Sequence, residues 1–108
     1  MSETAEQILR HRVFLSLQRA FLGEVFPALR SVSVEWSERD IRFYAYIDGP
    51  PQAEDLESLS CVGAEVTADF PDEISVDYEV IRLDSPAPIE DARERVYSRR
   101  KKTQGCAL

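Results

Sequence analysis

The sequence predicts an α+β domain, a two-layer sandwich in which two helices cover one face of an antiparallel sheet of three to four strands. Two patterns lead to this prediction. Apolar residues recur at three- and four-residue spacing over 3–22 and 52–70, and they alternate with polar residues over 30–36, 41–48 and 73–83. The resulting order is α-β-β-α-β. A chain of 108 residues, 44% of them hydrophobic, has room for one domain with a substantial core.

The first predicted helix covers residues 3–22. Ser2 or Thr4 can cap its start, and Gly23 followed by Pro27 ends it, because glycine readily leaves the helical conformation and proline cannot continue it. The apolar stripe that should face the sheet comprises Ile8, Leu9, Val13, Phe14, Leu17, Ala20 and Phe21.

Two alternating segments follow and predict a hairpin. The polar turn 37–40 separates them. Asp48 and Gly49, followed by two prolines, end the second strand, since proline cannot donate a hydrogen bond to a neighbouring strand. The residues predicted to face the core are Val32, Val34, Trp36, Ile41, Phe43, Ala45 and Ile47; those predicted to face away are Ser31, Ser33, Glu35, Arg42, Tyr44 and Tyr46.

The second helix, 52–70, should pack through an apolar face, and the strand 73–83 should complete the sheet. Residues 89–98 are ambiguous between a short edge strand around Val96 and a short helix. We expect one domain over 1–98 and a basic, disordered tail over 99–108. The apolar face of the second helix comprises Leu56, Leu59, Val62, Gly63, Val66 and Phe70.

Charge is distributed very unevenly along the chain. From Asp48 to Asp91 there are thirteen carboxylates and one basic residue, Arg82, so this segment carries a charge of −12 although the whole chain carries only −7. Such a field attracts cationic partners and repels polyanions. From charge alone two interpretations remain open: a surface that imitates a phosphate backbone and occupies a cationic groove, and a surface that serves solubility.

Several classes of function find little support. The single histidine, His11, excludes a histidine-based metal cluster, and we find no nucleophile elbow and no glycine-rich phosphate loop. No enzymatic activity, metal or cofactor is therefore expected. Carboxylates near 48–57 could hold Mg²⁺, but acids at a helix start are favoured by the helix dipole without any function. The acidic balance argues against nucleic-acid binding despite Tyr44 and Tyr46.

The sequence also bears on location. Its apolar runs are too short to cross a membrane, and the N-terminus does not have the pattern of a signal peptide. The two cysteines, Cys61 and Cys106, do not suggest a disulfide framework. A cytoplasmic protein is expected.

Exposed carboxylates at the start of the second helix and tyrosines on the sheet face opposite the helices are our candidate contacts with a protein partner. Tyrosine is a common interface anchor, and carboxylates steer a basic partner into place. The predicted partner-binding residues are Tyr44, Tyr46, Asp48, Glu54, Asp55 and Glu57.

Over roughly residues 8–100 the chain resembles a family of small bacterial proteins, the immunity proteins of contact-dependent growth inhibition and related polymorphic toxin systems. The resemblance implies a cytoplasmic protein that binds and neutralises a toxin domain, often a nuclease. Residues 100–108 extend beyond the expected end of the family. The stretches that carry the resemblance are 21–32 (FLGEVFPALRSV), 44–49 (YAYIDG), 65–71 (EVTADFP), 81–86 (IRLDSP) and 96–99 (VYSR).

The leading hypothesis is therefore a non-enzymatic immunity protein whose acidic surface occupies the basic groove of a toxin. The alternative is a structural or regulatory module that forms a homodimer through the open face of its sheet, with Tyr44 and Tyr46 in the interface.

Overall fold

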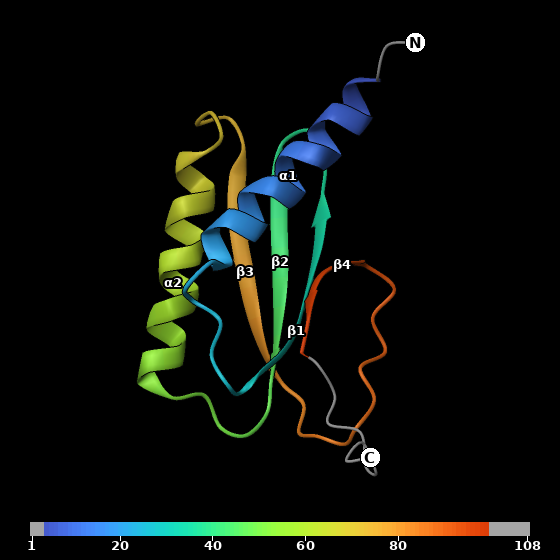
Figure 1. The fold of residues 1–108 in the computed structure, drawn as a ribbon. Coiled ribbons are helices and arrows are strands. Elements are labelled where there is room, and N and C mark those ends of the chain that lie inside the picture. The colour runs from blue at the N-terminus through green and yellow to red at the C-terminus, as the bar shows by residue number, and fades with distance from the viewer. Residues whose placement is uncertain (1–3, 100–108) are drawn as a thin grey trace, which may run out of the picture.

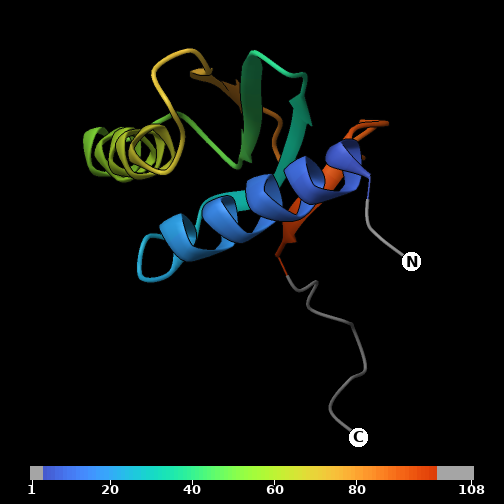
Figure 2. The same cartoon turned by 90° about the horizontal axis from the view of Figure 1, so that it is seen from above.

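A computed structural model describes residues 4–99. Two helices lie on the same side of a four-stranded sheet with the order β3-β2-β1-β4 (Figures 1 and 2). This confirms the α+β sandwich, and the first five elements begin and end within two residues of their predicted bounds. The elements are α1 (Ala5–Phe21), β1 (Leu29–Trp36), β2 (Asp40–Ile47), α2 (Ala53–Ala68), β3 (Ser75–Arg82) and β4 (Glu94–Ser98).

The sheet is mixed, so the prediction of an antiparallel sheet was wrong for one pair. β1 runs antiparallel to β2 and to β4, but β3 runs parallel to β2, from Asp40 opposite Ser75 to Ile47 opposite Arg82. The reason lies in the connection. α2 carries the chain back along the sheet before β3 begins, and a helical crossover of this kind joins parallel strands.

Of the two residues predicted to cap α1, Thr4 does so, and it forms a capping box with Gln7; Ser2 lies outside the described residues. The Thr4 hydroxyl accepts a hydrogen bond from the N–H of Gln7 at 3.1 Å, and the Gln7 side chain accepts one from the N–H of Thr4 at 3.0 Å. At the other end, Gly23 has a φ of 82°, a conformation that glycine adopts without steric cost. Ile8, predicted to face the core, is instead 47% exposed, because it lies on the outward side of α1.

The core lies between the helices and the sheet and centres on Phe43, which is fully buried. Its ring meets Phe21 of α1 edge-on at 6.0 Å between centroids and stacks on Tyr78 of β3 at 5.1 Å. Gly63 allows α2 to approach β3 closely, since a Cβ atom at this position would lie 3.2 Å from the Tyr78 ring. Leu56, predicted to face the core from α2, is 42% exposed.

The ambiguous C-terminal segment contains a strand. β4 pairs with β1 along the edge of the sheet, with an irregularity between Val32 and Ser33. The next residue, Arg99, was assigned to the tail, but its N–H donates to the carbonyl of Arg30 at 2.8 Å. The rest of the predicted disordered tail, residues 100–108, lies outside the described residues.

We expect Phe43→Ala to lower the free energy of unfolding by about 3–5 kcal/mol, because it leaves a cavity between three elements. Urea unfolding of the two proteins measures this difference. The neighbouring change Arg42→Ala is the control. Arg42 is exposed and forms only a 3.4 Å ion pair with Glu79, so its loss should cost about 1 kcal/mol or less. Similar losses for both variants would contradict the central place of Phe43.

Candidate partner-binding surface

The helix-free face of β1 and β2 carries the two candidate tyrosines. The strand register sets Tyr44 opposite Ser33 and Tyr46 opposite Ser31. Their direction was predicted correctly, but their exposure was not, because Tyr44 is only 4% exposed and Tyr46 only 8%. The two tyrosines are therefore not surface anchors in this structure.

The connection between β3 and β4 covers these rings. The Tyr46 hydroxyl donates to Asp91 at 2.6 Å, and the guanidinium of Arg93 lies 3.8 Å from the centre of the Tyr44 ring. Arg93 also forms an ion pair with Asp91 at 3.1 Å, while the Tyr44 hydroxyl donates to Glu35 of β1. Polar contacts thus fasten residues 91–93 onto the sheet.

The same contacts shift the acidity of these groups. Burial raises the pKa of Tyr46 to about 12, and its hydrogen bond to Asp91 adds to the shift. Burial and then the hydrogen bond to Glu35 raise the pKa of Tyr44. Burial also acts to raise the pKa of Asp91, but the hydrogen bonds from Tyr46 and from the N–H of Arg93 outweigh it and lower this pKa.

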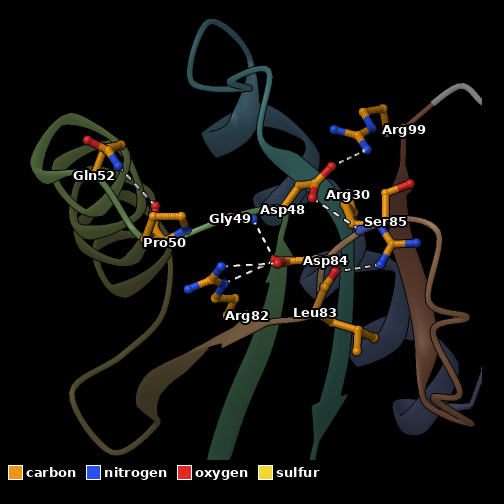
Figure 3. A network of polar contacts seen from close by, with 10 residues as sticks. All are labelled: Arg30, Asp48, Gly49, Pro50, Gln52, Arg82, Leu83, Asp84, Ser85 and Arg99. Carbon is orange, nitrogen blue, oxygen red and sulfur yellow. Dashed lines mark hydrogen bonds and ion pairs between the residues drawn. The ribbon is translucent and has the colours of Figure 1, made fainter.

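Asp48 belongs to a polar network at the end of the sheet where β2 and β3 finish (Figure 3). Its carboxylate accepts a hydrogen bond from the N–H of Ser85 at 3.1 Å and forms an ion pair with Arg99 at 3.3 Å. Arg30 donates to the carbonyls of Leu83 and Ala87 at 2.6 and 2.8 Å. The candidate residue Asp48 thus contributes to the fold, because it holds the start of the β3–β4 connection in place.

Asp84, in the same network, links the ends of β2 and β3. It accepts a hydrogen bond from the N–H of Gly49 at 2.7 Å and two from Arg82 at 3.0 Å. The Arg82 hydrogen bonds first, and then that of Gly49, lower the pKa of Asp84. Gly49 has a φ of 82°, which lets the chain turn sharply toward α2.

The other three candidates lie together in the first turns of α2. Glu54 and Glu57 are exposed and Asp55 is partly buried. Within residues 4–99 no cation lies within ion-pair distance of any of them. Gln52, at the cap position, does not accept a hydrogen bond from the helix, so the N-terminal dipole of α2 favours these negative charges. Glu65, about two turns farther along α2, is also exposed.

The negative charge is concentrated on α2, β3 and the turn between them. We call residues 53–82 the α2–β3 unit; it holds nine acids and one basic residue, Arg82, for a net charge of −8. Five of the thirteen carboxylates from Asp48 to Asp91 are paired with arginines. These five are Asp48, Asp69, Glu79, Asp84 and Asp91. Three of the five lie outside the unit, so most of the unpaired charge lies within it.

Sequence reasoning missed one feature of this surface. A hollow of about 400 Å³ opens where the β1–β2 turn meets β3. Three carboxylates and one arginine line it, so it is suited to a cationic side chain. The alternation of the strands does not reveal it, because Asp77 joins the other residues only through the parallel pairing of β3. The lining residues are Glu35, Trp36, Ser37, Asp40, Ile41, Arg42 and Asp77.

The sequence model of the MafI2 immunity protein family matches residues 10–101, which is most of the chain. The chain belongs to the MafI2 immunity protein family. Membership confirms the resemblance to immunity proteins of polymorphic toxin systems and implies a role in neutralising a protein toxin. A search of curated proteins found no match.

Two other features concern this MafI2-family protein, namely metal sites and membrane-spanning helices. Among residues 4–99, no group of three or more histidine, cysteine or acidic side chains is arranged to hold a metal ion. Over the same residues, neither helix combines the length and the apolar character that a membrane crossing requires.

We expect Tyr46→Phe to remove an ionisation step centred at about pH 12 from the alkaline titration of the protein, followed by tyrosinate absorbance. The folded protein holds this proton more tightly than the unfolded chain. The interaction therefore stabilises the fold below about pH 10, and this contribution is lost as the pH rises toward 12. A variant that loses a step near pH 10 instead would show that Tyr46 is solvated.

Proposed function

We propose that this protein neutralises a toxin domain by binding it, without catalysis, through the acidic α2–β3 unit. The observation that supports the proposal is the charge of −8 on this unit in a member of an immunity-protein family. A basic active groove, such as that of a nuclease, is the toxin surface that this charge complements.

The proposed contacts follow from exposure. Glu54 and Glu57 point outward and, within residues 4–99, have no cationic partner, so they are available to a toxin. Asp55 supports them from a partly buried position. In this proposal Tyr44, Tyr46 and Asp48 act indirectly, since their hydrogen bonds hold the β3–β4 connection in place.

The proposal also covers reaction, cofactor, cellular location and nucleic acid. We assign the protein no reaction and no cofactor, and we place it in the cytoplasm, where a toxin delivered into or made by the cell would act. A net charge of −7 disfavours nucleic acid as the direct partner, because phosphates would be repelled.

Replacing both glutamates, Glu54→Lys and Glu57→Lys, should lower the association rate with the cognate toxin domain by about tenfold and weaken the dependence of that rate on salt concentration. Stopped-flow fluorescence at several salt concentrations measures both quantities.

The matched control is Glu6→Lys with Glu90→Lys, which makes the same change of net charge at exposed positions outside the unit. Its association rate should stay within about threefold of the original, because the charges lie farther from the proposed contact. Equal effects of the two double variants would mean that only the net charge matters and that α2 is not the contact.

Homodimerisation is the second candidate function. The interface predicted from the sequence, through Tyr44 and Tyr46, loses its support because both residues are buried. A different feature favours it. Ile8 and Leu15 of α1 and Leu22, the residue at its C-cap, follow one another at seven-residue intervals and are 47%, 55% and 78% exposed. Apolar residues at this spacing allow two helices to pair along their length.

We expect light scattering to give the monomer mass of 12.3 kDa at micromolar concentration. Three aliphatic side chains supply little of the roughly 800 Å² per partner that a stable interface buries. The second candidate gains support if the protein is instead a dimer and Leu15→Glu returns it to a monomer without unfolding it.

A further inference from the structure

Among residues 4–99, no strand pairs with the outer edge of β3. β3 ends the sheet, with β2 as its neighbour on one side only (Figure 1). The N–H of Ser75 donates to the carbonyl of Arg39, just before β2, at 2.8 Å, and the N–H of Leu83, just after β3, donates to Ile47 at 2.9 Å. Because backbone groups alternate in direction along a strand, the N–H and C=O groups of the even-numbered residues between them point away from β2. Those residues are Val76, Tyr78, Val80 and Arg82.

The two sides of this edge differ in chemistry. The side chains of Val76, Tyr78 and Val80 pack against the core on the helix side and are only partly buried. On the other side, Asp77 and Glu79 are exposed, and Glu79 also forms a 3.4 Å ion pair with Arg42 of β2. A strand laid along β3 would therefore meet an apolar row on one side and an acidic row on the other.

β3 has few of the features that normally keep a sheet edge from pairing. Proteins protect such edges with prolines, bulges, lysines or very short strands. β3 is eight residues long, contains no proline, and keeps its register with β2 without a break from Asp40 to Ile47. Its acidic side chains repel another acidic strand, but they attract a basic one.

This charge also argues against a second copy of the same chain. If two β3 edges paired about Tyr78 in antiparallel fashion, Asp77 of each copy would face Glu79 of the other. Like charges in directly opposed positions destabilise a strand pair. Charge complementarity therefore selects a basic partner strand.

We propose that the toxin adds a strand to the outer edge of β3, through an extended segment in which apolar residues alternate with lysine or arginine. This inference rests on the proposed function and specifies the element of the toxin that is recognised. The apolar residues contact Val76 and Val80 beside α2, and the basic residues contact Asp77 and Glu79. The backbone supplies the hydrogen bonds, and the alternation supplies specificity.

The hollow near the start of β3 fits the same geometry. Asp77 lies on β3 and also lines the hollow, together with Glu35 and Asp40. A basic side chain of the added strand that passes Asp77 therefore reaches this hollow. Asp77 and Asp40 attract it there, whereas Glu35 is already paired with Arg93 at 3.5 Å and Arg42 opposes it.

Hydrogen exchange of the backbone amides, read residue by residue by NMR, tests the proposal with the cognate toxin domain. In the protein alone, the amides of Val76, Tyr78 and Val80 should exchange much faster than those of Asp77 and Glu79, which point toward β2. In the complex, the three outward amides should slow by at least tenfold. Binding without this slowing overturns the strand-addition proposal and leaves the proposed function intact, whereas no binding at all overturns both.

A pair of substitutions at one position gives a second test. Val76→Pro removes an outward N–H group without removing a hydrogen bond to β2, and edge strands tolerate proline at such positions. Val76→Ala removes most of the same side chain and keeps the N–H group. Provided that thermal unfolding shows both variants folded, Val76→Pro should weaken toxin binding at least tenfold more than Val76→Ala. Equal affinities would overturn the proposal.

Discussion

Because β3 runs parallel to β2, the chain between these strands must travel back along the whole sheet, and α2 makes this return. α2 therefore lies next to β3, and the acids of these two elements are brought together, although Asp69 pairs with Arg19 of α1. The close approach of α2 at Gly63 to the Tyr78 ring fixes this arrangement, and the stacking of Tyr78 on Phe43 connects it to the core. The placement of the negative charge thus depends on one crossover and one tight helix–strand contact.

Around the β3–β4 connection, carboxylates form ion pairs with arginines, so little unpaired charge remains there. Arg93 satisfies Asp91 and covers the Tyr44 ring, and Arg99 satisfies Asp48. These pairs bring the β3–β4 connection back over the helix-free face and leave the α2–β3 unit as the region of unpaired carboxylates. Carboxylates are mostly paired around the β3–β4 connection and mostly unpaired in the α2–β3 unit. The molecule therefore has an uneven charge distribution that its net charge alone does not describe.

Periodicity was sufficient to place the five main elements, because their apolar patterns are long and regular. The parallel direction of β3 was missed, although the helical connection before it is the known mark of a crossover. The burial of Tyr44 and Tyr46 was not predictable from alternation, because the residues that cover them come from an irregular segment beyond β3. Likewise, Asp48 and Arg99 lie 51 residues apart, so no local pattern could reveal their pairing. Exposure of Glu54 and Glu57 followed from helix geometry alone.

Ser31 and Ser33 lie on the helix-free face of the sheet, which the β3–β4 connection covers. Neither hydroxyl has a hydrogen-bond partner among the described residues. Their small size leaves room for the tyrosine rings opposite them, a requirement that alanine would meet equally well. A desolvated hydroxyl without a partner costs about 1–3 kcal/mol, so the domain is less stable here than its architecture allows. Replacing the two serines by alanine would therefore raise the free energy of unfolding. Both positions lie outside the α2–β3 unit, so the change would leave its charges intact.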